Sequence, residues 1–334
     1  MRESLGYRLL YPYVRWVYTA LYCRTFEVVG AERVPLDRPV VFVVTHQNNL
    51  PDACAVLFAT PRRPVFVARA DLFRSPLVAR ALGFLRILPM YRADHGRRAI
   101  EEKLPETMDR LRTHLISRGA CVIMAEGTSA TTRTLRRLKK GWARLVLDTL
   151  PEAEGLVVVP VAVEFSNWYA WGPDQRVTVG EPLVFEPASV GVPRHLNEMN
   201  ARLHSALARL IRSDDEIEAW HRQISAQRTG RDALWRVVGL PALAVLLVAF
   251  APVLVFTQWR VYRHPRADFR ATIEVGTLAV GMPIWALGLG LVIAGTLGWE
   301  AFLAGAVALP LIGWAAARSW IAWTSPGVSR SASV

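Results

Sequence analysis

The sequence predicts an α/β fold, with a mostly parallel sheet flanked by helices and followed by C-terminal membrane helices. Between residues 28 and 185, short β-branched runs alternate with stretches of helix length. This alternation is typical of a parallel sheet covered on both faces. The last third of the chain then contains three runs without any charged residue, at 237–257, 275–298 and 301–317. Each run is long enough to enter or cross the hydrocarbon layer of a membrane.

Composition narrows the class of protein further. The chain has 334 residues and is 52% hydrophobic, which is too apolar for a disordered chain. Its formal net charge is +12. A basic excess suits either nucleic acid or an anionic membrane surface. The apolar runs favour the membrane, and the arginines are spread along the chain, so we expect no nucleic-acid partner. Cys23, Cys54 and Cys121 form no C-x-x-C pair and predict reduced thiols.

The first element, within residues 1–27, is a predicted helix at a membrane interface. Residues 5–22 mix large apolar and aromatic side chains with spaced arginines, a composition that suits the boundary between lipid and water. Pro12 predicts a break in this helix. An amphipathic helix packed on the protein core is an equally good interpretation.

The second region, residues 28–193, is the predicted α/β domain. Its expected strands and the helices between them follow from the two hydrophobic periods. The strands are 40–44, 64–68, 121–124, 157–165 and 176–180, and the helices are 53–59, 75–85, 97–119 and 141–150. Functional residues of such folds gather where strands pass into loops at their carboxyl ends.

A polar helical connector, residues 194–236, leads into the membrane region at 237–320. Arginines flank both ends of run 237–257, and positive loops stay in the cytoplasm. We therefore expect 237–257 to form a re-entrant hairpin bent near Pro241 or Pro252, and 275–298 and 301–317 to span the membrane. Three full spans are the alternative. The tail, 321–334, is predicted to be disordered.

The end of the first buried strand carries a possible acid–base pair. The run 40–44 passes into a polar turn with His46, and Asp52 follows six residues later, where a helix begins. Imidazole can accept a proton from a hydroxyl near neutral pH. A carboxylate on its other ring nitrogen would fix the tautomer. Taken alone, a histidine in a polar turn is more often a structural residue.

Three further segments follow this turn in order. Residues 85–92 (LRILPMYR) end a further predicted strand with Arg92. Residues 123–128 (IMAEGT) contain Glu126, Gly127 and Thr128, and residues 157–163 (VVVPVAV) form a buried strand. Lys139 and Lys140 open the helical stretch LKKGWARLVL at 138–147. Together these blocks resemble those of the glycerolipid acyltransferase family, typified by glycerol-3-phosphate and 1-acylglycerol-3-phosphate acyltransferases. The resemblance covers roughly residues 25–185, and the C-terminal apolar region resembles a subgroup with membrane segments.

The resemblance implies a role for each residue. His46 would be the general base that deprotonates the acceptor hydroxyl, and Asp52 would orient it. Arg92 would hold the acceptor phosphate, with Arg69 as a second anionic contact, while Glu126, Gly127 and Thr128 would shape the acceptor pocket. The acyl donor would be acyl-CoA or acyl-carrier protein, and neither metal nor other cofactor is expected.

Two departures from the family pattern bear on the acceptor. Ser129 stands where the family has an arginine, so one phosphate donor is missing, and Arg133, Lys139 or Lys140 could replace it. His46 and Asp52 are separated by five residues instead of four, a spacing that the subgroup shares.

We therefore expect a multi-pass membrane enzyme with a cytoplasmic catalytic domain, which acylates glycerol-3-phosphate or 1-acylglycerol-3-phosphate in phospholipid biosynthesis. Another lysophospholipid, an aminolipid or a glycolipid is the alternative acceptor. A non-catalytic lipid-binding membrane protein is the alternative of a different class.

Overall fold

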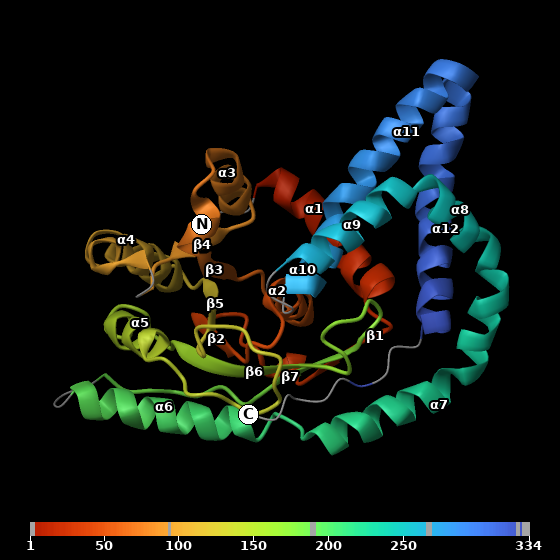
Figure 1. Ribbon diagram of the computed structural model, residues 1–334. Coiled ribbons are helices and arrows are strands. Elements are labelled where there is room, and N and C mark those ends of the chain that lie inside the picture. Colours follow the sequence, from red (N-terminus) through yellow and green to blue (C-terminus); the bar gives the residue numbers. More distant parts are fainter. Residues whose placement is uncertain (1–3, 93–94, 188–191, 265–268, 325–327, 329–334) are drawn as a thin grey trace.

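A seven-stranded sheet forms the centre of the computed structural model, which describes residues 4–92, 95–187, 192–264, 269–324 and 328 (Figure 1). The strand order is β1-β7-β6-β2-β5-β3-β4, and only β6 and β7 pair antiparallel. The strands are β1 (Thr25–Val29), β2 (Val40–Val44), β3 (Val65–Arg69), β4 (Ile87–Met90), β5 (Ala120–Met124), β6 (Val157–Phe165) and β7 (Asp174–Val179). The predicted mostly parallel sheet is confirmed, and β1 is an additional strand at its edge.

Helices cover both faces of this sheet. Alternate residues of β2 point to opposite sides, so Val41 and Val43 pack with one set of helices and Val40, Phe42 and Val44 with another. The first set is α4 (Arg97–Ile116), α5 (Gly141–Thr149) and α6 (Val192–Ala208). The second face is covered by α2 (Asn49–Ala59). Both faces of β2 are therefore dry, which explains its unbroken apolar sequence.

The N-terminal helix packs outside α2. Helix α1 (Leu5–Trp16) continues directly into the π-helical segment η1 (Val17–Tyr22). Pro12 lies inside α1, so the predicted break at this proline is wrong. Val17, Tyr18, Leu21 and Tyr22 share a buried cluster with residues of α2 and of the C-terminal helices. This segment therefore joins the sheet domain to the C-terminal region.

The stretch predicted as a polar connector, 194–236, is formed by most of α6 and most of α7 (Asp214–Val238). A buried charge cluster ties α7 to the sheet: His221 Nδ1 lies 2.7 Å from Asp174 Oδ2, and Arg24 Nε donates to Asp174 Oδ1 at 2.8 Å. Burial raises the pKa of Asp174, but hydrogen bonds from His221 and Arg24 outweigh burial, and the net shift is downward. Asp174 therefore stays charged at neutral pH and holds α7 in place.

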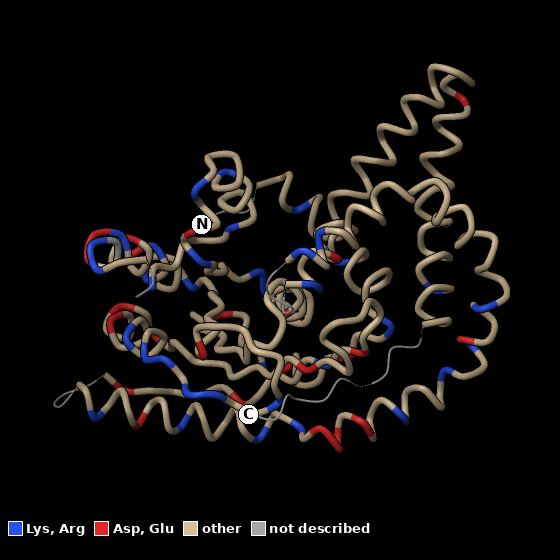
Figure 2. Tube along the Cα trace, viewed as in Figure 1, with Lys and Arg blue, Asp and Glu red and all other residues tan. Residues whose placement is uncertain are grey.

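The C-terminal helices project away from the sheet (Figure 1). Two helical segments, Arg270–Leu297 and Trp299–Thr324, are long and apolar enough to cross a membrane, and Figure 2 shows them almost without charge along their length. The first contains α10 (Arg270–Gly276), η6 (Thr277–Gly281) and α11 (Met282–Leu297), and the second is α12. The first segment contains the predicted span 275–298 except for its last residue, Gly298, and the second contains the predicted span 301–317.

The run 237–257 is bent twice. Helix α7 meets α8 (Leu240–Ala249) at Gly239 with an angle of 57°, and α8 gives way to α9 (Ala251–Arg263) at Phe250. Whether this run re-enters the membrane or crosses it stays a prediction. Most of the tail predicted to be disordered lies outside the described residues.

Smaller elements complete the chain order. They are the 3₁₀ turns η2 (Ala31–Arg33) and η3 (Ala70–Phe73) and helix α3 (Pro76–Phe84).

Candidate active site

The site lies at the carboxyl ends of two neighbouring strands in the middle of the sheet. Strands β2 and β5 pair in parallel with Val44 opposite Met124. The turn after β2 and the turn after β5 therefore leave the same edge of the sheet side by side, which brings His46 and Glu126 together. The backbone N–H of His46 donates to Glu126 Oε1 at 2.8 Å.

His46 and Asp52 are in direct contact. His46 Nδ1 lies 2.9 Å from Asp52 Oδ2, and the same oxygen accepts hydrogen bonds from the backbone N–H groups of Gln47 at 2.8 Å and Asn48 at 2.7 Å. Asp52 is fully buried in the first turn of α2, whereas the His46 side chain keeps 12% of its surface exposed. The longer spacing between them is taken up by the turn that folds over the carboxylate. The Nε2 atom of His46 is left as the ring nitrogen for a substrate.

The Glu126 carboxylate holds the turn after β2 in place. It is buried, with 6% of its surface exposed, and its second oxygen accepts a hydrogen bond from Arg136 Nε at 2.7 Å. Its contacts are thus with His46 and Arg136, so it positions the site residues rather than lining an open pocket with its carboxylate.

Arg136 is the site residue that sequence reasoning missed. Besides Glu126, its guanidinium donates to Thr128 Oγ1 at 2.9 Å, to the Thr128 carbonyl and, at 3.4 Å, to the His46 carbonyl. One arginine thus binds the loops after β2 and β5 to each other. The available signal was weak, because Arg136 is one of several basic residues between 133 and 140.

Gly127 and Lys139 lie together beside this clamp. Gly127 has φ of +80°, a conformation that glycine adopts without strain. A Cβ added there would lie 3.2 Å from Lys139 Cγ, so the stem of the lysine passes over this turn. Lys139 is exposed, and Lys140 is half-buried just before α5. Lys139 therefore brings a positive charge to the turn after β5.

Arg69 and Arg92 lie farther along the same edge. Arg69 ends β3, and its Nε and Nη2 donate to the carboxylate of Asp71 at 3.0 and 3.2 Å. Its charge is therefore largely offset by Asp71. Arg92 follows β4, three strands from β2 in the sheet order, which at about 4.8 Å per strand is roughly 14 Å. Its backbone N–H donates to His95 Nδ1 at 3.1 Å.

Ser129 and Arg133 both have partners within the protein. Ser129 Oγ donates to Asn49 Oδ1 at 2.9 Å. Arg133 is buried, with 5% exposure, where it pairs with Asp214 at 2.8 Å and stacks 4.2 Å from the Trp168 ring. The suggestion that Arg133 replaces the missing phosphate donor is therefore wrong, because its guanidinium is committed inside the protein.

Comparisons with known proteins give the family of the sheet domain. Residues 25–164, which include β1 to β5 and most of β6, match the family model described as Acyltransferase. The chain carries an acyltransferase domain. A similar solved structure is that of the 1-acyl-sn-glycerophosphate (LPA) acyltransferase PlsC from Thermotoga maritima. The two sequences are 18% identical and the TM-score is 0.43, and the match covers 60% of this chain and 79% of the PlsC chain. No curated protein matches the sequence.

The acyltransferase domain contains every residue that the sequence placed in the site, from His46 to Lys140. Within the described residues, no group of three or more His, Cys, Asp or Glu side chains could hold a metal ion. The described side chains that meet at the site are the His46–Asp52 pair and the Glu126–Arg136 pair.

Proposed function

We propose that this protein transfers a fatty acyl group from acyl-CoA or acyl-carrier protein to a hydroxyl of glycerol-3-phosphate or 1-acylglycerol-3-phosphate, at a membrane surface in phospholipid biosynthesis. The observation that carries the proposal is the 2.9 Å contact between His46 Nδ1 and Asp52 Oδ2 at the carboxyl edge of β2. The acyltransferase family of residues 25–164 supplies the reaction class.

In this proposal His46 acts as the general base. Asp52 holds the proton on Nδ1, so Nε2 accepts the proton of the acceptor hydroxyl. The hydroxyl oxygen forms a bond to the thioester carbonyl carbon, the bond from that carbon to sulfur breaks, and His46 returns the proton to the departing thiolate. The Asp52 carboxylate stabilises the imidazolium between these two steps. General base catalysis of this kind contributes roughly 10²–10⁴-fold.

Transfer is direct, without an acyl-enzyme. Cys54 is the thiol nearest to Asp52 in the sequence, and burial together with the neighbouring Asp52 charge raises the pKa of Cys54 to about 12. The thiol therefore stays protonated at neutral pH, and a protonated thiol is a poor nucleophile. His46 serves the acceptor hydroxyl rather than this cysteine.

The phosphate of the acceptor is held by Lys139 and Arg92. Lys139 is exposed beside Gly127, next to the turn that contacts His46, and Arg92 lies on the same edge of the sheet. Arg69 and Lys140 contribute positive potential around this contact. Guanidinium and ammonium groups are the usual protein ligands of phosphate.

A second acceptor class is favoured by one observation. Ser129 occupies the position where the family resemblance implies an arginine, and its hydroxyl is bonded to Asn49. A neutral side chain there suits a lysophospholipid with a larger headgroup, an aminolipid or a glycolipid.

The test is an acceptor panel with the full chain in phosphatidylcholine nanodiscs and radiolabelled acyl-CoA. Glycerol-3-phosphate, lysophosphatidic acid, lysophosphatidylcholine and monoacylglycerol are compared. We expect labelled product with the phosphate monoesters, and Lys139→Gln should raise their KM without changing that of monoacylglycerol. Arg144→Gln, on the exposed face of α5, is the matched control. Product from none of these acceptors would refute the proposal, and equal use of monoacylglycerol would refute the phosphate contact.

A further inference from the structure

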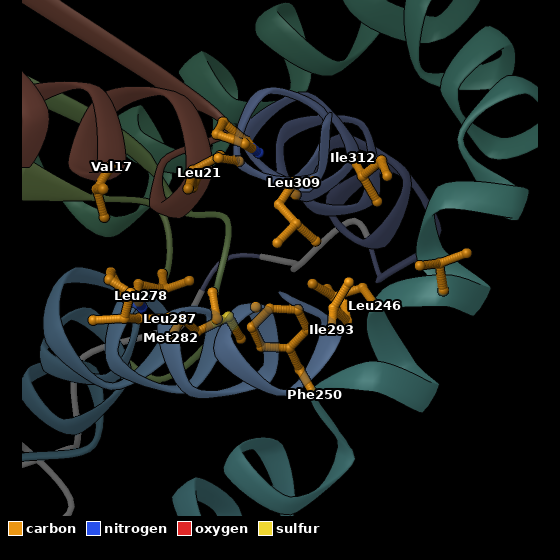
Figure 3. A pocket seen from close by; sticks show the side chains of 18 of the residues that line it. Val17, Leu21, Leu246, Phe250, Leu278, Met282, Leu287, Ile293, Leu309 and Ile312 are labelled. Atoms are coloured by element: carbon orange, nitrogen blue, oxygen red, sulfur yellow. The ribbon is translucent and has the colours of Figure 1, made fainter. Parts of the chain in front are cut away.

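An apolar cavity of about 340 Å³ lies among the helices beyond the acyltransferase domain (Figure 3). Its walls come from both ends of the chain, because η1 supplies one side while α8, α11 and α12 supply the others. Residues on these walls include Val17, Leu21, Leu246, Phe250, Met282 and Leu309. The side chains labelled in Figure 3 point toward a common space between these helices.

The lining of the cavity selects a hydrocarbon ligand. None of the described residues that line it carries a charge. Tyr13 is one of its few polar members, and its hydroxyl already donates to the Ala279 carbonyl at 3.1 Å. A ligand therefore finds van der Waals contacts but few free hydrogen-bonding partners. Apolar cavities of this kind do not retain water and accept apolar molecules.

The cavity opens on the outside of the membrane helices. Val245 and Leu287 contribute to its lining, yet 48% and 57% of their surfaces stay exposed. Helices α11 and α12 belong to the two segments that are long and apolar enough to cross a membrane. An opening in such a surface faces lipid, so the ligand that enters it is the chain of a lipid.

Hydrogen bonds join the region of the cavity to α2, the helix that carries Asp52. On η1, between Val17 and Leu21, the Tyr18 hydroxyl donates to the Pro51 carbonyl at 2.8 Å, and Pro51 directly precedes Asp52. On α10, Thr272 Oγ1 accepts a hydrogen bond from the backbone N–H of Leu50 at 3.3 Å. The first turn of α2 is thus held by η1, which lines the cavity, and by α10, which continues into the lining segments η6 and α11. The wall that carries Val17 and Leu21 therefore lies beside the turn of α2 that contains Asp52.

We propose that this cavity binds the acyl chain of a monoacyl glycerophospholipid, the acceptor whose free hydroxyl reacts at His46. The inference rests on the proposed function and narrows it, because glycerol-3-phosphate has no chain to place in the cavity. The chain is recognised by van der Waals contact with the apolar lining, because a chain that enters from the bilayer leaves hydrocarbon rather than water.

Photo-crosslinking tests the site independently of turnover. The probe is lysophosphatidic acid with a diazirine at the end of its acyl chain, added to the His46→Ala protein in phosphatidylcholine nanodiscs. We expect label on peptides of α11 and α12 that line the cavity, removed by excess unlabelled lysophosphatidic acid. Label that excess unlabelled lysophosphatidic acid leaves unchanged, or label spread evenly over the helices, would overturn the proposal.

Filling the cavity gives a second measurement. A Cβ added at Gly305, which lines the cavity, meets no heavy atom within 4 Å, so Gly305→Leu should fold and occupy the space. We expect it to reduce the crosslink and to lower kcat/KM for octadecanoyl acceptors several-fold more than for dodecanoyl acceptors. Gly295→Leu, an equally open and exposed position on α11 outside the cavity, is the control and should change neither.

The two proposals fail differently. A wild-type protein that acylates no lysolipid refutes the proposed function, whereas the crosslink in His46→Ala reports on the cavity whatever the turnover. An unchanged chain-length preference in an active Gly305→Leu enzyme would overturn the cavity assignment alone.

Discussion

Replacing Asp52 by asparagine removes one charge from the site while keeping the size of the side chain. Oδ2 of Asp52 now accepts hydrogen bonds from His46 Nδ1 and from the backbone N–H groups of Gln47 and Asn48. The oxygen of an asparagine can still accept from the two backbone groups. A neutral amide cannot, however, balance the positive charge that forms on His46 during proton transfer.

The magnitude follows from the contact distance. Opposite unit charges 2.9 Å apart attract by about 6 kcal/mol at an effective dielectric constant of about 20. The imidazolium exists only after the hydroxyl has lost its proton, so this loss raises the barrier rather than weakening substrate binding. It corresponds to a fall in kcat of about four powers of ten. The free energy of unfolding should fall by only about 2 kcal/mol, because the hydrogen bonds weaken but persist.

The assay measures initial rates of acyl transfer in nanodiscs at saturating donor and acceptor, together with thermal unfolding of the same preparations. Asp148→Asn, on the exposed surface of α5, makes the same chemical change away from the site and should match the wild type. A kcat of Asp52→Asn within tenfold of the wild type would refute the reasoning, since the carboxylate would then play no part in the transition state.

Further predictions concern the residues that hold the site and the sheet. Arg136→Ala leaves the buried Glu126 carboxylate without its cation, so we expect a loss of about 2 kcal/mol in the free energy of unfolding and a lower kcat with little change in KM. An unchanged kcat would show that the clamp does not position His46. Burial lowers the pKa of His114 to about 4, below the value of about 6.5 in an unfolded chain. The unfolded state therefore binds the extra proton, and the free energy of unfolding should fall as pH decreases from about 6.5 to about 4. His114→Gln should remove that part of the slope in urea unfolding, and an unchanged slope would contradict the assignment.

The central part of the fold could be predicted from the sequence because burial leaves a direct mark there. Both faces of β2 and of β6 are covered, and this produces the continuous apolar runs at 40–44 and 157–165. The edge strand β1 is only half-buried, so its five residues show no such run. The break predicted at Pro12 is wrong because the tendency of proline to break a helix is a local effect. Contacts with α2 and the C-terminal helices hold the helix that contains Pro12.

Some residues of the site could be predicted from the sequence and others could not. His46 and Asp52 are close in sequence, so a single turn can bring them into contact, and a motif can reveal them. Arg136 reaches His46 across 90 residues, and nothing in its local sequence distinguishes it from Arg133 or Arg137. The burial of Arg133 against Trp168 likewise depends on the path of the chain after β6. Charge identity is visible in a sequence, but the partner that takes up the charge is not.

Turnover by His46→Ala tests the central claim most directly. The variant is compared with His204→Ala, an exposed histidine on α6, after both are shown to insert into nanodiscs and to unfold at the wild-type temperature. The account predicts that His46→Ala loses at least about 10²-fold in kcat while His204→Ala keeps full activity. Turnover by His46→Ala equal to that of the wild type would contradict the account, because the hydroxyl would then be deprotonated without this imidazole.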